Sequence, residues 1–322
     1  MNLLDLNSKW ENVLNFKNKE GYKALRISAE CVPDLFIAIN IEGYRCLLLF
    51  LPSNIELEIN EIDKEKLSLT YFQNKNIIVI KLNDVGFLDL FNDLILSLYE
   101  KIKKINDPKN SSKEFIYSFN KWAAFFENKL NTKLSFEEIQ GLFGELFVLD
   151  ELLDGSSFVE VNSILSSWKG PYDTTNDFVF DTKNIEVKTK EKSKSFVKIS
   201  SEYQLEKEFE KGLELLIVSV KIDLINGKSI HDLLIKIVKY LRANSVDASI
   251  LYKAIIQKGL TLESVKQYNN HKFIVVKTHL YDCNIDGFPM LSASNIPQEI
   301  TGLRYKLRVN TLSPFLINEK KY

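Results

Sequence analysis

The sequence is poor in the residues that build disulfide-bonded or zinc-binding proteins. Its 322 residues include three cysteines and three histidines. Cys31, Cys46 and Cys283 are far apart and odd in number, which argues against a disulfide framework and favours a reducing cytoplasm. The histidines are scattered without metal-ligand spacing, so a zinc site is not expected.

Long apolar runs, an excess of one charge and a phosphate-binding loop are missing as well. The run Cys46–Leu51 is far shorter than the ~20 residues that span a membrane, and the acidic segment Met1–Asp5 does not resemble a signal peptide. The formal net charge of -1 gives the whole chain no attraction to DNA, so a DNA-binding surface has to be local. Without a Gly-rich phosphate loop, an ATPase is not expected.

The remaining composition, 45% hydrophobic and 26% charged residues, is that of a globular protein with a sizeable core. This length favours two domains. We predict a strand-rich N-terminal domain over residues 1–110 for packing or interaction, and an α/β domain with a C-terminal extension over residues 111–322. For the first domain the pattern predicts helices over 4–16 and 87–105, a hairpin of strands 36–40 and 45–51, and strands over 55–59, 67–72 and 77–80.

In the second domain, an apolar stripe at helical spacing and a capping box of Ser135 and Glu138 predict a helix over 135–153. Alternating segments after it predict a set of strands. The other predicted elements are helices over 115–130, 230–241 and 248–258, a short helix from about 202, and strands over 177–180, 185–190, 197–200, 215–222, 273–281 and 303–309.

The strand over 185–190 carries the candidate chemistry. Its side chains alternate between faces, so Glu186, Lys188 and Lys190 share the face opposite Ile185 and Val187. A hairpin turn after the preceding strand would pair the two strands and bring Asp177 near Glu186. Two carboxylates and a lysine then share one small patch.

Such a patch is costly unless a cation offsets the repulsion between the acids. A hard divalent cation, Mg²⁺ with Mn²⁺ as a substitute, suits carboxylate ligands, polarises a phosphate and lowers the pKa of a bound water. Lys188 would orient or deprotonate that water and offset transition-state charge. The alternative is a solvated strand face of alternating charge, because such spacings also arise by chance in a chain with 43 acidic and 42 basic residues.

Two neighbouring patterns support the chemical interpretation. Gly141 and Gly144 each cost about 1 kcal/mol inside the helix over 135–153, which suggests that another backbone comes close to them, and Glu145 follows directly. A local lysine stretch with Ser200 could meet phosphates, or could be a solvated loop edge. This stretch comprises Lys183, Lys188, Lys190, Lys192, Lys194 and Lys198.

Several of these segments, in this order, resemble a bacterial family of PD-(D/E)XK nuclease-fold proteins within the restriction-endonuclease-like superfamily. The matching segments are Gly141–Leu146, Trp168–Pro171, Asp177-Phe178, Glu186–Thr189, and Ile199–Ser201 with Gln204-Leu205. The resemblance covers most of the chain, although its specific motifs lie between residues 140 and 205. Asn176 stands where the motif name has proline.

The resemblance implies a mixed central sheet flanked by helices, in the order helix–strand–strand–strand–helix–strand. It also implies roles for individual residues. Glu145, Asp177 and Glu186 would be metal ligands, Lys188 would act on the water, and Gln204 would assist. Such families are often linked to DNA restriction or phage defence, next to methyltransferases and ATPases.

We therefore expect a Mg²⁺-dependent DNA endonuclease of a restriction-modification or phage-defence system, with DNA contacts at Lys190, Lys192, Lys194, Lys198 and Ser200. The alternative is a non-catalytic subunit that uses the same fold to bind DNA or to hold a defence complex together. An RNase or a repair nuclease remains a third hypothesis. By analogy with other such nucleases, we also expect a homodimer.

Overall fold

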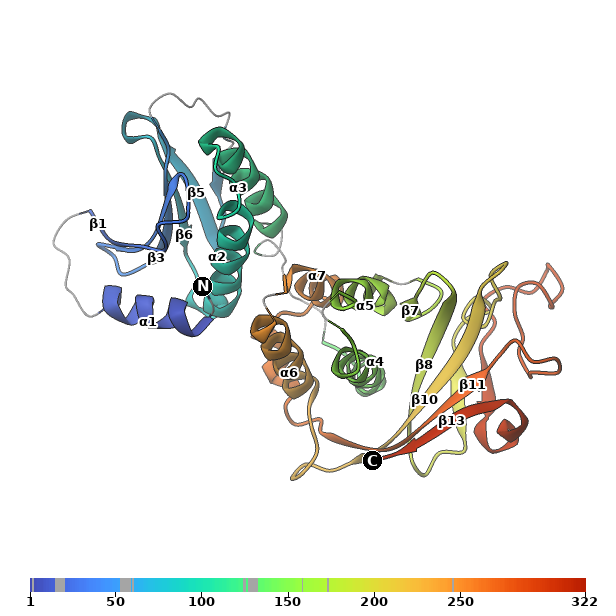
Figure 1. The fold of residues 1–322 in the computed structure, drawn as a ribbon. Helices are drawn as coiled ribbons and strands as arrows, with labels where there is room; N and C mark the ends of the chain where they lie inside the picture. The colour runs from blue at the N-terminus through green and yellow to red at the C-terminus, as the bar shows by residue number, and fades with distance from the viewer. Residues whose placement is uncertain are drawn as a thin grey trace. The chain divides into compact units, whose positions relative to one another are not determined.

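The computed structural model describes residues 1, 3–14, 21–52, 59, 61–123, 126, 133–157, 159–172, 174–244 and 246–322. The chain divides into two compact units (Figure 1). The first comprises Met1–Lys129 with Asp247–Ser249, and the second comprises Leu130–Val246 with Ile250–Tyr322. Four residues of the predicted strand over 55–59 and most of residues 124–130 of the predicted helix over 115–130 lie outside the described residues.

The first unit contains a six-stranded antiparallel sheet with the strand order β1-β2-β3-β6-β5-β4. The strands are β1 (Tyr22–Arg26), β2 (Asp34–Asn40), β3 (Arg45–Phe50), β4 (Ile62–Asp63), β5 (Leu67–Phe72) and β6 (Ile77–Leu82). The predicted hairpin is confirmed as β2 and β3, and the strands predicted from residues 67 and 77 are confirmed as β5 and β6.

Among the described residues of this unit, the α-helices are α1 (Leu3–Leu14), α2 (Leu88–Ile102) and α3 (Pro108–Ala123). The buried Trp10 of α1 donates its indole N–H to Asn92 of α2 at 3.0 Å, which ties the two helices together. The prediction that α3 begins near residue 115 is wrong. Pro108 is tolerated in a first helical turn, because the N–H that it lacks has no partner within the helix there.

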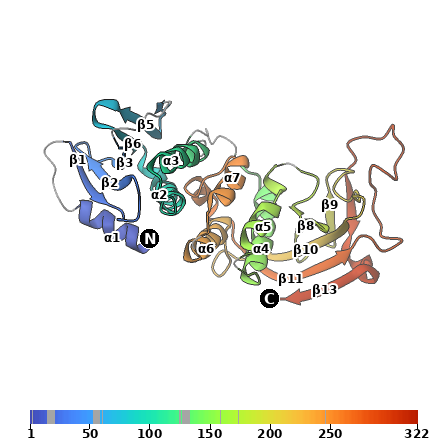
Figure 2. The same cartoon turned by 45° about the horizontal axis from the view of Figure 1, so that its top comes forward.

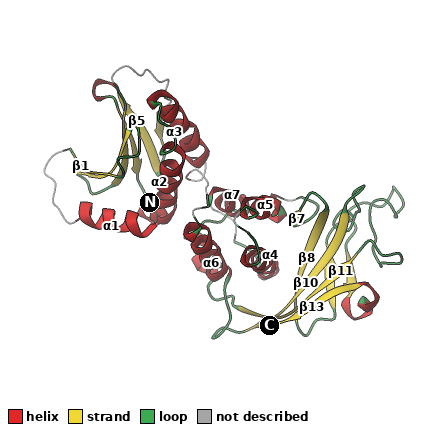
Figure 3. Cartoon of the chain, in the orientation of Figure 1, coloured by secondary structure: helices red, strands yellow, loops and turns green. Residues whose placement is uncertain are grey.

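The second unit is built on a five-stranded mixed sheet with the order β13-β11-β10-β8-β7 (Figure 3). β8 and β10 are parallel and the other neighbours are antiparallel. The strands are β7 (Phe178–Val179), β8 (Lys183–Glu191), β10 (Gly212–Ile222), β11 (Phe273–Asp282) and β13 (Leu316–Lys321). The predicted mixed α/β class is confirmed.

One face of this sheet packs against helices. α4 (Phe136–Asp154) packs on that face, α5 (Val161–Ser167) and α6 (Ile230–Ala243) pack against α4, and α7 (Ser249–Gln257) follows α6 in the chain. α4 packs against both β8 and α6 (Figure 2), and it begins with the predicted capping box of Ser135 and Glu138. Within the described ranges, none of the helices has the length and apolar character needed to cross a bilayer.

The opposite face carries a second, smaller layer. β9 (Phe196–Ile199) leaves the main sheet and pairs with β12 (Tyr305–Arg308). The two strands pack apolar side chains against the inward-facing Leu213, Leu215 and Ile217 of β10. The third strand of the predicted set is β9, and it lies on one face of the main sheet instead of within it. In the chain it is followed by β10, where the resemblance implied a helix.

The short helix predicted from about residue 202 is wrong. Residues 201–205 form turns, because side-chain hydrogen bonds close them locally. Ser201 accepts from the N–H of Tyr203, and Gln204 accepts from the N–H of Ser200. Serine side chains that bond nearby backbone groups compete with helix formation in this way. The prediction also missed β1, β4, α5 and β13, which lack a clear helical or alternating pattern.

The strand pairing decides which side chains of β8 face which layer. Glu186 and Lys188 are in register with Leu215 and Ile217, so they face the β9–β12 layer. Thr189 faces α4, where an added Cβ on Gly144 would collide with its hydroxyl and lie 3.1 Å from its Cβ. The predicted close approach is therefore confirmed at Gly144, although it involves a side chain, and Gly141 has open space.

These two glycines make a matched pair for a stability test. Gly141→Ala should raise the free energy of unfolding by roughly 0.5–1 kcal/mol, since alanine restricts the unfolded chain and nothing obstructs its methyl group. Gly144→Ala should lower it by about 1–3 kcal/mol, because the β-branched Thr189 is too stiff to move aside cheaply. Urea unfolding followed by circular dichroism measures both, and equal effects would contradict the packing at Gly144.

Candidate active site

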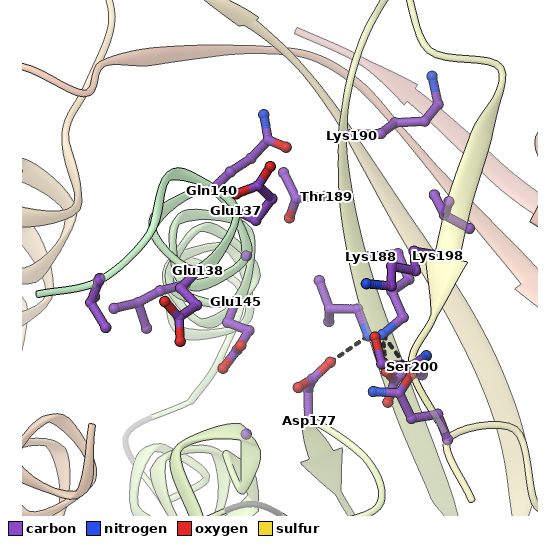
Figure 4. A pocket seen from close by; sticks show the side chains of 18 of the residues that line it. Glu137, Glu138, Gln140, Glu145, Asp177, Lys188, Thr189, Lys190, Lys198 and Ser200 are labelled. Atoms are coloured by element: carbon purple, nitrogen blue, oxygen red, sulfur yellow. Dashed lines mark hydrogen bonds and ion pairs between the residues drawn. The ribbon is translucent and has the colours of Figure 1, made fainter. Parts of the chain in front are cut away.

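The residues predicted for catalysis surround one pocket of about 820 Å³ in the second unit. Its walls come from the first half of α4, from β8 and from β9 with the turn after it (Figure 4). Five predicted residues line it: Glu145, Asp177, Glu186, Lys188 and Gln204. Sequence positions up to 59 residues apart are thus brought together, as expected.

Asp177 lies at the point where the β7–β8 ladder ends. β7 pairs through Phe178 with Ile185, so the next position places Asp177 opposite Glu186. The Asp177 carboxylate accepts a hydrogen bond from the backbone N–H of Val187 at 2.7 Å. The side chain thereby bonds an N–H that the backbone of a longer β7 would have bonded. It lies on the same side of the hairpin as Glu186, as predicted.

Glu145 reaches the same pocket from α4, as predicted (Figure 4). The indole N–H of the buried Trp168 donates to its carboxylate at 2.9 Å and fixes its orientation. Gly170 packs against both acids, since a Cβ there would collide with Glu145 and come within 2.9 Å of Asp177. The two carboxylates therefore lie on either side of one small space.

The loop of Trp168 and Gly170 also holds Asp177 through the backbone. The N–H groups of Lys169 and Gly170 both donate to the Asp177 carbonyl, at 2.7 and 3.0 Å. The sequence marked this loop only as part of the family resemblance and gave it no role. A tryptophan two residues before a glycine was the available signal, but the partner of the tryptophan, Glu145, is 23 residues earlier in the chain.

Glu186 and Lys188 form a buried ion pair with 2.6 Å between Nζ and Oε1. Their side chains are 2% and 15% exposed. The Gln204 side-chain oxygen accepts from Lys188 at 3.0 Å and from the backbone N–H of Ser200 at 2.8 Å. Gln204 is thus placed beside Lys188 and restricts the position of its ammonium.

Burial has a large effect on the three carboxyls. It is the main cause that raises the pKa of Glu145 to about 8 and that of Glu186 to about 8, and the charge of Asp177 adds to both shifts. Burial also raises the pKa of Asp177, against the opposing charge of Lys188. At neutral pH Glu145 and Glu186 therefore retain protons, because the charges of the nearby lysines do not offset the effect of burial.

The pKa of Lys188 is raised as well, but for a different reason. Burial by itself would lower its pKa, but the charges of Glu186, Asp177 and Glu145 outweigh burial and hold the pKa above its usual value. Lys188 is consequently a firm cation while these carboxylates carry charge.

Four of the five residues predicted to contact DNA line the pocket: Lys190, Lys194, Lys198 and Ser200. Lys198 and Ser200 are exposed and line the pocket, as does Lys194, which pairs with Glu191 at 3.0 Å. Lys190 is buried and donates to the carbonyl of Lys194 at 2.7 Å, so its ammonium closes the turn between β8 and β9. Lys192 is exposed but does not line the pocket.

Lys258 lines the pocket and was not predicted. It follows α7 and reaches the site from 70 residues beyond Lys188 in the chain. An isolated lysine at the end of an apolar helix carries no local signal of such a role, so only the tertiary structure could identify it.

The donor set suits a hard divalent cation. Three carboxylates with raised pKa values share the pocket, and oxygen ligands of this kind are those that Mg²⁺ and Mn²⁺ prefer. Across the residues that the structure describes, no three His, Cys, Asp or Glu side chains lie close enough together to form a preassembled metal cluster. Glu186 would therefore have to exchange part of its contact with Lys188 to serve as a ligand.

The comparison with protein families agrees with this geometry. Residues 6–310 match the model of a family described as "Putative PD-(D/E)XK family member (DUF4420)". The chain belongs to this family. The predicted resemblance is confirmed over nearly the whole chain, and the membership supports a nuclease-type function. Curated proteins and solved structures gave no match.

The raised carboxyl pKa values predict how stability depends on pH. Between pH 4.5 and about 8, the folded protein holds protons on Glu145 and Glu186 that the unfolded chain releases. The metal-free protein should therefore lose stability as pH rises through this window. The Glu145→Gln/Glu186→Gln double variant should lose that pH dependence, because glutamine imitates the protonated side chain.

Thermal unfolding in EDTA between pH 5 and 9 tests this prediction. Glu137→Gln is the matched control, because Glu137 lines the same pocket but is exposed. Adding Mg²⁺ should raise the melting temperature of the wild type more at pH 8.5 than at pH 6, since metal and protons compete for the carboxylates. Parallel pH profiles for the wild type and the double variant would refute the burial effect.

Proposed function

We propose that this protein is a Mg²⁺-dependent DNA endonuclease of a restriction or phage-defence system. The observation that carries the proposal is the pocket that Glu145, Asp177 and the buried Glu186 line together with Lys188, whose ammonium contacts Glu186. This cluster is costly for folding, because burial and the charge of Asp177 raise the pKa of both Glu145 and Glu186, and such perturbed groups gather at functional sites. Family membership gives the cluster its chemical class.

Asp177, Glu186 and Glu145 are the groups proposed to hold Mg²⁺, for which Mn²⁺ could substitute. The bound ion would polarise the scissile phosphate and lower the pKa of a bound water. The residues around the acids position them: Trp168 orients Glu145, and the N–H of Val187 orients Asp177. Gly170 leaves the space between Glu145 and Asp177 open.

Lys188 is proposed to orient the attacking water and to offset transition-state charge. Its pKa is raised by the same carboxylates that would serve as metal ligands. Neutralising those charges leaves burial as the dominant influence, and burial lowers the pKa of a lysine. The ammonium could then give up its proton more readily, which also fits the role of general base.

The proposal extends to the substrate and the setting. Lys198 and Ser200 are exposed beside the acids and could contact the DNA backbone. Cys31, Cys46 and Cys283 are unpaired and buried, as suits a reducing cytoplasm. A homodimer, and a methyltransferase or ATPase as partner, are part of the proposal by analogy with other defence nucleases.

A second candidate function is a non-catalytic DNA-binding or scaffolding subunit. The 2.6 Å contact between Lys188 and Glu186 favours it, because this pair already satisfies two of the proposed catalytic groups. Cleavage assays decide between the two functions. Plasmid and phage DNA, methylated and unmethylated, would be incubated with Mg²⁺, Mn²⁺ or EDTA. Metal-dependent cuts support the enzyme, and binding without cuts supports the subunit.

The variant Lys188→Met should distinguish the endonuclease from the non-catalytic subunit. We expect cleavage to fall by about 100-fold or more, because the lysine acts mainly in the transition state. DNA binding and folding at pH 7 should be largely retained, since Glu186 can take up a proton when its partner is lost. Lys183→Met on the same strand is the control, because Lys183 pairs with Glu214 and does not line the pocket. Equal cleavage by both variants would remove Lys188 from the mechanism.

A further inference from the structure

Lys258 is held at a defined place beside the acids. The last turn of α7 closes with hydrogen bonds from the N–H of Gly259 to Ile256 and from the N–H of Leu260 to Ile255, at 2.8 and 3.1 Å. Leu260 is 1% exposed and anchors the segment in the core. The backbone of Lys258 is therefore fixed between a helix end and a buried residue.

The side chain of Lys258 belongs to the helical wall of the pocket. Burial raises the pKa of Glu145 and of Asp177, and the charge of Lys258 acts in the opposite direction on both. Lys198 and Ser200 lie on the other wall, which β9 and the turn after it provide (Figure 4). Asp177 lies between the two walls in that view.

Two explanations of Lys258 lead to different behaviour. As a mere counter-ion, it would stabilise the charged carboxylates and compete with a metal for them. As a phosphate ligand, it would add a cation to a pocket in which Glu137 and Glu138 otherwise repel nucleic acid from the helical wall. Lys258 follows α7 and Lys198 lies on β9, so two separate elements bring a lysine to the pocket. This fits the second explanation, because a bound strand carries phosphates on both sides of the scissile bond.

We propose that Lys258 is a positioning residue that binds a phosphate flanking the scissile phosphodiester. The strand then crosses the pocket between Lys258 on the helical wall and Lys198 on the sheet wall, with the scissile phosphate at the carboxylates. This inference rests on the proposed nuclease function. Lysine suits the role because it contacts phosphate as a compact point charge.

The test measures how nucleic-acid binding depends on salt. Affinities of the full-length protein for labelled single-stranded and duplex DNA, and for RNA of the same sequence, would be measured with Ca²⁺ at 50–300 mM KCl. Lys258→Gln should reduce the slope of log K against log salt by about one unit, the loss expected for one phosphate contact. Lys198→Gln should act similarly, and Lys258→Arg should restore the slope.

Lys253→Gln is the matched control, because Lys253 lies on the exposed side of α7 and does not line the pocket. It should leave the slope unchanged. In cleavage assays, Lys258→Gln should raise KM more than it lowers kcat, which a purely structural change would not do selectively.

Three results would overturn the inference. If Lys258→Gln keeps the wild-type slope while wild type binds and cuts DNA, Lys258 is not a phosphate ligand, and the proposed function still stands. If the variant only binds Mg²⁺ more tightly, Lys258 is a counter-ion. If wild type binds no nucleic acid, both proposals fail. A changed slope without any cleavage by wild type would support the phosphate contact and count against the enzyme.

Discussion

The candidate site depends on the burial of Asp177. Its carboxylate lies opposite Glu186 and beside Glu145, and its charge raises the pKa of both. It stays in this position because β7 is only two residues long and begins at Phe178. The N–H of Val187 is therefore left for the Asp177 side chain. A longer β7 would satisfy that N–H by backbone pairing and would remove the anchor.

Two segments of the surrounding structure maintain this costly arrangement. Trp168 and Gly170 form a loop that holds the backbone of Asp177 and the side chain of Glu145. Gln204 comes from the turn after β9 and accepts a hydrogen bond from Lys188. Carboxylates that are kept together against their mutual repulsion favour the binding of a cation, as a metal-dependent nuclease site requires.

The lysines of the chain divide into structural and accessible groups. Lys190 closes a turn with its ammonium, and Lys188 is paired with Glu186. Lys198 is exposed at the pocket, and Lys258 arrives from another helix. A basic run in a sequence is therefore a poor guide to a nucleic-acid surface, because hydrogen bonds and ion pairs within the fold occupy some of its ammonium groups.

The sequence by itself determined the elements with strong patterns and the identity of the acidic cluster. The capping box and apolar stripe predicted α4, and strict alternation predicted β8 with Glu186 and Lys188 on one face. Only the tertiary structure decided the rest: the departure of β9 into a second layer, the turns at 201–205, and the contacts of Trp168, Gly170 and Lys258. The physical reason is the separation along the chain of the residues that interact. Periodicity and capping are local, whereas these contacts join segments far apart in the chain and depend on how the layers pack.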